Sequence, residues 1–107
     1  MQKTILGLIE KIKINGKELK AKIDTGAQGN SIDIKLAQKL RLGPIIKTYK
    51  IKTSAGHARR PAVRAHLEIK GRKFNTIFNV SDRKHMEYPV LIGRRILKKG
   101  FLVDVSK

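Results

Sequence analysis

The stretch Ala21-Lys22-Ile23-Asp24-Thr25-Gly26-Ala27 decides the fold, because in it an alternating strand runs into an Asp-Thr-Gly turn. The strand would deliver Asp24, Gly26 would let the backbone turn tightly beneath it, and the Thr25 hydroxyl could tie the turn down. Such a turn can aim backbone N–H groups at a carboxylate, which makes Asp24 a candidate catalytic residue. The tripeptide also suits a purely structural turn, since Asp and Gly are the commonest turn residues.

The residues before this turn are typical of a β-hairpin. Apolar side chains alternate along residues 12–14 and 19–23, on either side of Asn15-Gly16. Asn-Gly suits a type I′ turn because both central residues need positive φ. We therefore expect one strand over residues 4–14 and a second that ends at Asp24.

The residues after the turn predict further strands and little helix. Leu36, Ala37 and Leu40 have helical spacing and predict a short helix, which Asp33 could cap. The expected fold class is all-β with one or two short helices, in a single domain over residues 1–107. Alternation predicts strands at 45–53, 62–70, 73–80, 89–92 and 101–105, a long mobile hairpin end at 54–61, a tight turn at 71–72, a polar loop at 81–88 and a helical turn at 94–99.

Composition excludes several classes of site. The chain has no cysteine, so it has no disulfide framework, thiolate nucleophile or cysteine metal site. No run approaches the roughly 20 apolar residues of a membrane span, and the start lacks the long apolar region of a secretory signal. We therefore expect a cytoplasmic protein without a membrane partner.

The charge is strongly positive, with 25 Lys and Arg against 8 Asp and Glu, for a formal net charge of +17. This charge suits a polyanionic partner such as nucleic acid or acidic peptide, and equally a solvated lysine-rich surface. The basic residues are spread along the chain, and two Tyr and three Phe offer little base stacking. Charge is thus the only support for nucleic-acid binding.

The chain also contains a short internal similarity. Residues 12–17 resemble residues 67–72, and each segment leads towards an apolar strand and a short helix. The similarity predicts two alike halves, one contributing Ile23-Asp24-Thr25-Gly26 and the other Leu91-Ile92-Gly93.

Taken together, these segments resemble a retropepsin-type aspartic peptidase, over nearly the whole chain. The similarity rests on Asp24-Thr25-Gly26-Ala27, on Gly56-His57-Ala58-Arg59-Arg60-Pro61, on Val90-Leu91-Ile92-Gly93-Arg94 and on Phe101-Leu102-Val103-Asp104, in the family's order. It is nearest to small prokaryotic retropepsin-like proteins that are labelled ATP-dependent zinc proteases.

The resemblance implies a closed barrel of the acid-protease type and a role for each segment. Asp24 would be catalytic, with Thr25, Gly26 and Ala27 supporting its turn. A flap over the substrate would include Ala55, Gly56, His57 and Arg59, and a structural floor would consist of Leu91, Ile92, Gly93 and Arg94. In place of the acidic residue that viral enzymes pair with the Arg of the floor, this chain has Gln28, a neutral amide.

The resemblance also implies a homodimer, because aspartic-peptidase chemistry needs two carboxylates that share one proton. The chain has one Asp-Thr-Gly, so the second Asp24 would come from another copy, and residues 1–5 and 101–107 would pair at the interface. Basic residues at the flap suggest an acidic peptide or protein substrate. The alternative is a retropepsin-fold dimer that binds acidic peptides or nucleic acid without cutting.

Neither zinc nor ATP is expected, so the predicted metal and cofactor content is none. His57, His66 and His85 lack the spacing of a helical zinc site, and the chain has no Gly-x-x-x-x-Gly-Lys-Ser/Thr phosphate loop.

Overall fold

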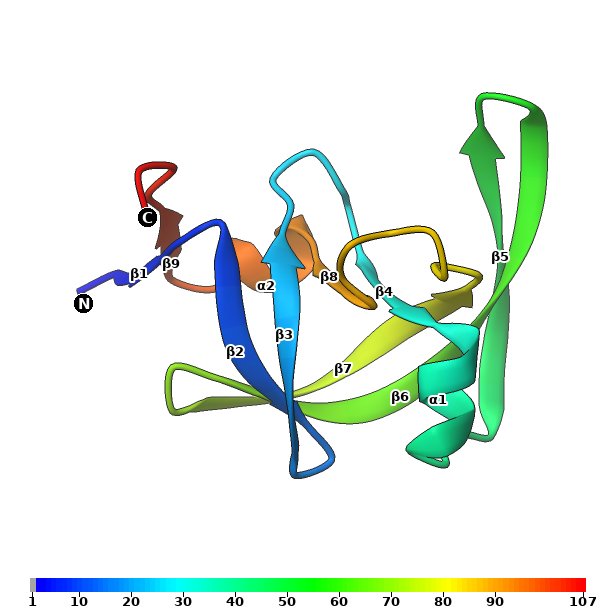
Figure 1. Cartoon of the computed structure of the whole chain (residues 1–107), viewed down its shortest axis with the longest axis horizontal. Helices are drawn as coiled ribbons and strands as arrows, with labels where there is room; N and C mark the ends of the chain where they lie inside the picture. The colour runs from blue at the N-terminus through cyan, green and yellow to red at the C-terminus, as the bar shows by residue number, and fades with distance from the viewer. Residues whose placement is uncertain (1) are drawn as a thin grey trace.

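Residues 2–107, which the computed structural model describes, form nine strands and two short helices (Figure 1). The strands are β1 (Thr4–Leu6), β2 (Ile9–Ile14), β3 (Lys17–Ile23), β4 (Asn30–Asp33), β5 (Ile45–Thr53), β6 (Gly56–Ile69), β7 (Arg72–Ser81), β8 (Val90–Ile92) and β9 (Phe101–Val103), and the helices are α1 (Ile34–Lys39) and α2 (Arg94–Leu97). The predicted all-β class with one or two short helices is confirmed.

Two hairpins build most of the barrel. Strands β2 and β3 turn at Asn15-Gly16, whose φ angles of 47° and 84° are the positive values that the sequence predicted. Strands β6 and β7 turn at Lys70-Gly71, one residue earlier than expected, with φ angles of 51° and 76°. In both hairpins alternate side chains are buried, so period-two patterning located these strands well.

The hairpin of β5 and β6 differs from the prediction. Residues 54–61 are not a long mobile end, because Thr53 already pairs with Gly56 and the connection is the two residues Ser54-Ala55. The two arms extend beyond the barrel (Figure 1), and most of their side chains are exposed. With water on both faces the arms need no apolar alternation, and the sequence pattern therefore missed this part of β6.

The barrel closes through six strands. The order β2-β3-β8-β4-β7-β6 returns to β2, because Ile12–Ile14 of β2 also pair with Leu67–Ile69 of β6. At its centre β8 runs parallel to β3, β4 runs parallel to β7, and β4 and β8 are antiparallel to each other. Each half therefore places a hairpin, a connecting turn, a central strand and a helix in corresponding positions. The turn at 24–29 corresponds to the loop at 82–89, and β4 corresponds to β8.

The terminal strands form a separate pair. The predicted strand over residues 4–14 is broken at Gly7-Leu8, and the Gly7 N–H donates to Glu10 Oε2 at 2.6 Å. Strand β1 then lies parallel to β9 of the same chain. The last strand is shorter than expected and ends at Val103. Met1, the first residue of the predicted interface segment, lies outside the described residues.

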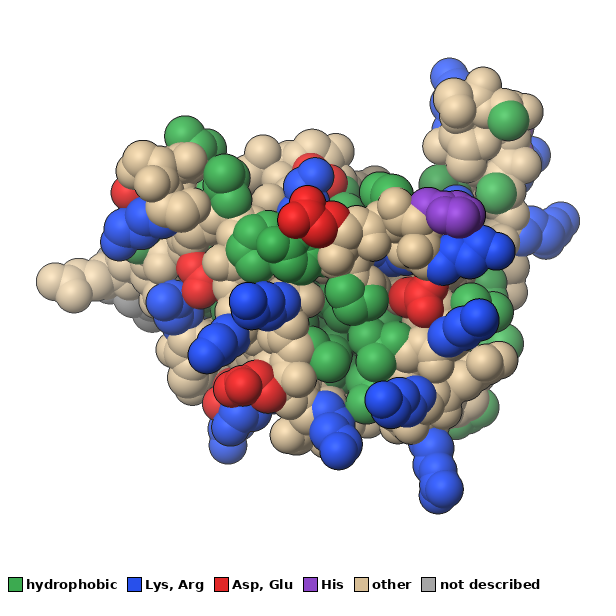
Figure 2. All heavy atoms as spheres, in the orientation of Figure 1, with side chains coloured by type: hydrophobic (Ala, Val, Ile, Leu, Met, Phe, Trp, Pro, Cys, Tyr) green, Lys and Arg blue, Asp and Glu red, His purple; other side chains and the backbone are tan. Residues whose placement is uncertain are grey.

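The interior of the barrel is apolar, with Phe78, Ile14 and Ile92 fully buried. Lys and Arg side chains are distributed over the face seen in Figure 2, and they do not gather into one basic patch there.

Within residues 2–107, no helix has the length and apolar character needed to cross a membrane.

Candidate active site

Asp24 lies at the end of β3, where the backbone leaves the barrel. Its N–H donates to the Ile92 carbonyl oxygen at 2.9 Å, which fixes the start of the turn against β8. Its side chain is half-buried, and Oδ1 accepts a hydrogen bond from the Gly26 N–H at 2.9 Å. A Cβ at Gly26 would lie only 3.2 Å from that oxygen, so glycine leaves room for the carboxylate. A backbone donor is therefore aimed at the Asp24 carboxylate, as the Asp-Thr-Gly pattern predicted.

The segment predicted as a floor lies directly against this turn. Leu91, Ile92 and Gly93 are buried, and the Arg94 N–H donates to the Ala27 carbonyl oxygen at 2.8 Å. A Cβ at Gly93 would collide with the Gly29 carbonyl oxygen and lie 2.8 Å from that of Ala27. Only a glycine lets the two segments approach this closely.

Arg94 braces the turn through its side chain as well. Its Nη1 donates to the Thr25 carbonyl oxygen at 2.9 Å, so the guanidinium bonds the backbone and not the Gln28 side chain. The Gln28 carbonyl oxygen accepts instead from the Arg95 N–H at 2.9 Å. The Thr25 side chain is exposed. The turn is thus held by backbone acceptors, which do not require the acidic residue found in viral enzymes.

A buried polar network behind the turn was not predicted. Asn30 is 2% exposed; its Oδ1 accepts from the Gly93 N–H at 3.1 Å, and its Nδ2 donates to the Ile77 carbonyl oxygen at 3.2 Å. The Asn79 Nδ2 donates to the Asn30 carbonyl oxygen at 2.8 Å, and Asn79 Oδ1 accepts from Ser31 Oγ at 2.8 Å. The sequence did offer a signal for this network, since Asn30 and Asn79 each lie beside apolar residues of a strand. An amide buried among such residues must find hydrogen-bond partners.

A cavity of about 620 Å³ lies between the turn and the β5–β6 hairpin. Of the predicted site residues, Gly26 and Ala27 line it, whereas the predicted flap residues do not. Ala55, Gly56, His57 and Arg59 lie at or near the exposed hairpin tip. The hairpin contributes other residues to the cavity, namely Tyr49, Lys50, Ile51, Lys52 and Arg60.

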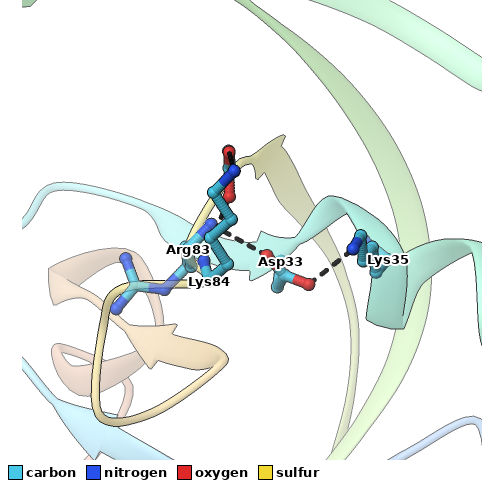
Figure 3. A network of polar contacts seen from close by, with 5 residues as sticks. Asp33, Lys35, Arg83 and Lys84 are labelled. Carbon is cyan, nitrogen blue, oxygen red and sulfur yellow. Dashed lines mark hydrogen bonds and ion pairs between the residues drawn. The ribbon is translucent and has the colours of Figure 1, made fainter.

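The loop at 82–89 contributes Arg83 to the same cavity. Figure 3 shows this arginine beside Asp33, which also contacts Lys35. Asp33 caps α1 by accepting from the Lys35 N–H at 3.1 Å, and its Oδ1 accepts from the Arg83 N–H at 2.8 Å. Burial lowers the pKa of Arg83 below its ordinary value; the carboxylates of Asp24 and Asp33 oppose this shift and Arg60 adds to it. Arg83 is therefore within electrostatic range of Asp24.

The described residues contain no cluster of side chains suited to binding a metal ion. Within residues 2–107 no three His, Asp or Glu side chains come together in an arrangement that could hold an ion.

Many solved structures are similar to the chain, and two of them are described by their identity and coverage. A protein of unknown function from Legionella pneumophila subsp. pneumophila str. Philadelphia 1 is 24% identical, with a TM-score of 0.73 over 97% of this chain and 95% of that one. The simian foamy virus (mac) protease is 22% identical, with a TM-score of 0.66 over 84% of this chain and 91% of the protease. At these identities the likeness shows the fold, which confirms the predicted retropepsin-like barrel.

A search of curated proteins gave no match. A family model described as "RimB-like: Retropepsin-like aspartic endopeptidase RimB" matches residues 31–107. The match begins after the Asp24 turn, so it identifies the family without testing Asp24 itself. The chain belongs to the RimB-like family of retropepsin-like aspartic endopeptidases.

Proposed function

We propose that the protein is an aspartic endopeptidase that works as a homodimer, with Asp24 of each subunit forming the catalytic dyad. One observation carries the proposal: the Asp24 carboxylate is half-buried on a turn whose backbone is fixed by β8 and α2, with the Gly26 N–H on one oxygen. A carboxylate held in this way is oriented for chemistry before substrate arrives.

The other aspartates support a second copy as the source of the partner carboxylate. Each of them already accepts a hydrogen bond from at least one backbone N–H group. Asp33 accepts from Lys35 and Arg83, Asp82 accepts from Lys84, and Asp104 accepts from Ser106. Asp33 caps α1, and Asp82 and Asp104 lie in other loops, so we place Asp24, on the turn after β3, at the two-fold axis.

The shape of the subunit is consistent with such an axis. In Figure 1 the turn after β3, the C-terminal strand β9 and the tip of the β5–β6 hairpin point to the same side of the molecule. Apolar side chains are exposed on and just after the C-terminal strand β9, including Leu102 at 51% and Val105 at 74%. A partner on this side would cover them and bring the two Asp24 turns together.

Peptide hydrolysis then needs no cofactor. One Asp24 carboxylate, ionised, takes a proton from a water molecule that attacks the scissile carbonyl carbon, while the protonated partner donates to the carbonyl oxygen. The tetrahedral intermediate breaks when the peptide nitrogen is protonated and leaves as an amine. Two carboxylates about 3 Å apart cannot both ionise, so the shared proton is available for this exchange.

The substrate that the cavity suits is an acidic peptide. Its lining includes Lys50, Lys52, Arg60, Arg83 and Arg95, and it includes no Asp or Glu. A cleft lined by charges of one sign attracts the opposite charge and raises its local concentration.

Cleavage of a denatured protein mixture and of acidic and basic peptide libraries, from acid to neutral pH, tests the proposal. We expect cleavage by the wild type, loss of cleavage in Asp24→Ala, and a dimeric mass by light scattering. Activity that survives in Asp24→Ala would end the aspartic-peptidase assignment. A dimer that binds acidic peptides and cuts none would favour the non-cutting alternative.

A further inference from the structure

Arg60 and Arg83 line a cavity whose lining includes no Asp or Glu, and the carboxylates that act on Arg83 from outside this lining are those of Asp24 and Asp33. Both arginine side chains are half-buried, in contrast to the exposed Lys50, Lys52 and Arg95 that line the same cavity. Arg60 lowers the pKa of Arg83, so the two positive charges lie within repulsive range of each other. The ion pairs within residues 2–107 are Lys13 with Glu68, Lys70 with Glu10 and Lys84 with Asp82, and they include neither arginine.

The backbone and side chain of Arg83 are both anchored. Its N–H donates to Asp33 Oδ1 at 2.8 Å, and its Nε–H donates to the Tyr88 carbonyl oxygen at 3.3 Å. Asp33 is itself 9% exposed and anchored at the start of α1, through the Lys35 and Leu36 N–H groups. Within residues 2–107 the Arg83 Nη atoms donate no hydrogen bond, whereas the Nε–H does. Two Nη donors on a fixed guanidinium match the two oxygens of a carboxylate.

We propose that Arg83, with Arg60 beside it, determines the specificity of the cleft by binding a carboxylate group of the substrate peptide. The inference rests on the proposed function, since it names the residues that would select an acidic peptide. Asp33 is a positioning residue: at the end of β4, where it pairs with Ser81 of β7, it accepts a hydrogen bond from the Arg83 N–H.

A peptide carboxylate suits this place better than a nucleic-acid phosphate. The lining includes one aromatic side chain, Tyr49, which offers little base stacking. A short oligonucleotide therefore serves as a competing probe in the test.

The test is binding in an Asp24→Asn background, where cleavage does not interfere and where the result does not depend on peptidase activity. Two labelled peptides that differ by Glu or Gln at one position are titrated by fluorescence anisotropy. Arg83→Gln is compared with Lys84→Gln, which removes the same charge from the neighbouring exposed residue. Circular dichroism checks that each variant is folded, and Arg83→Lys keeps the charge without the planar fork.

We expect the parent to prefer the Glu peptide. Arg83→Gln should weaken Glu-peptide binding about 10-fold or more and leave Gln-peptide binding unchanged, because hydrogen bonds to a charged group are lost. Lys84→Gln should change neither, and Arg83→Lys should give an intermediate loss. Asp33→Ala should reduce the Glu preference, and Asp33→Asn, which keeps an oxygen acceptor for the Arg83 N–H, should restore most of it.

Three results would overturn the inference. They are a parent without preference for Glu, equal weakening of both peptides in Arg83→Gln, and an oligonucleotide that binds more tightly than the Glu peptide and loses its affinity in Arg83→Gln. Failure of peptidase activity alone would contradict the proposed function and leave this binding result standing.

Discussion

The turn at 24–29 and the loop at 82–89 occupy corresponding positions in the two halves of the barrel, but they present opposite charges. Each follows the second strand of a hairpin and leads into a short central strand and a helix. The first carries the half-buried Asp24 carboxylate, and the second carries the half-buried Arg83 guanidinium. The same framework thus supplies a candidate catalytic acid on one side and a candidate recognition cation on the other.

Each connection is braced by the opposite half. Residues at the start of α2, Arg94 and Arg95, donate to carbonyl oxygens of the turn at 24–29. Asp33, at the start of α1, accepts from the loop at 82–89. Because the bracing is crossed, a substitution in one half should show its effect at the group carried by the other half.

The largest expected effect is the loss of catalysis in Asp24→Asn. In the proposed mechanism Asp24 exchanges protons in the transition state, so its replacement should lower kcat/KM by about 10³-fold, with an unchanged thermal midpoint. Asp82→Asn makes the same chemical change in the corresponding loop, on an exposed side chain, and should keep wild-type kinetics. Equal losses in the two variants would mean that the two connections are not functionally distinct.

Gly93→Ala should disrupt the packing of the segment at 93–95 against the turn at 24–29. The added Cβ would meet the carbonyl oxygens of Gly29 and Ala27, and we expect a loss of about 3 kcal/mol in the free energy of unfolding, measured by urea titration. Gly29→Ala is the matched control, because a Cβ there meets nothing within 4 Å. A Gly93→Ala protein as stable as Gly29→Ala would contradict this packing.

Asp33→Ala should loosen the loop at 82–89 instead. It removes the cap of α1 and the acceptor for the Arg83 N–H, at a cost of about 2 kcal/mol in the free energy of unfolding. Asp104→Ala removes a carboxylate that bonds only Ser106, two positions along the chain, and should have a much smaller effect. Similar urea midpoints for the two variants would show that Asp33 does not brace the loop.

The smallest expected effect concerns Asp82. A hydrogen bond from the Lys84 backbone N–H lowers the pKa of Asp82, so in acid the unfolded chain binds more protons than the folded one. The stabilisation is therefore present above the ordinary pKa of about 3.9 and is lost as the pH falls through the lowered value. Asp82→Asn should slightly reduce stability at pH 6 and converge with wild type in acid. A difference in stability between Asp82→Asn and wild type that increased in acid would contradict the lowered pKa of Asp82.

The parts of the fold that were predicted are those with local signals. Asn15-Gly16 fixes its turn through backbone preference, and Ala21 and Ile23 alternate because one face of β3 is buried. The Asp24 turn and the apolar strand β8 were also predicted, because the residues that mark each of them are adjacent in the sequence.

The parts that were missed depend on distant partners. Strand β4 contains Asn30 and Ser31, whose polar side chains are satisfied by residues of β7 and by Gly93, so no apolar pattern marks the strand. Arg83 faces the cavity because Asp33, 50 positions away, holds its backbone. Among the basic hairpin residues, Lys52 and Arg60 line the cavity whereas His57 and Arg59 lie nearer the tip, and no burial pattern along these exposed strands separates the two groups.

The claim that two copies of Asp24 form one site is tested most directly by mixing subunits. Wild-type protein at fixed concentration is incubated with an equal amount of Asp24→Asn, and cleavage of a labelled acidic peptide is followed. If subunits exchange within two-fold dimers, about half of the wild-type chains enter inactive mixed dimers, and the rate should fall to about half. A rate that does not change when Asp24→Asn is added, with exchange verified by mass spectrometry of the mixed dimer, would contradict the shared dyad.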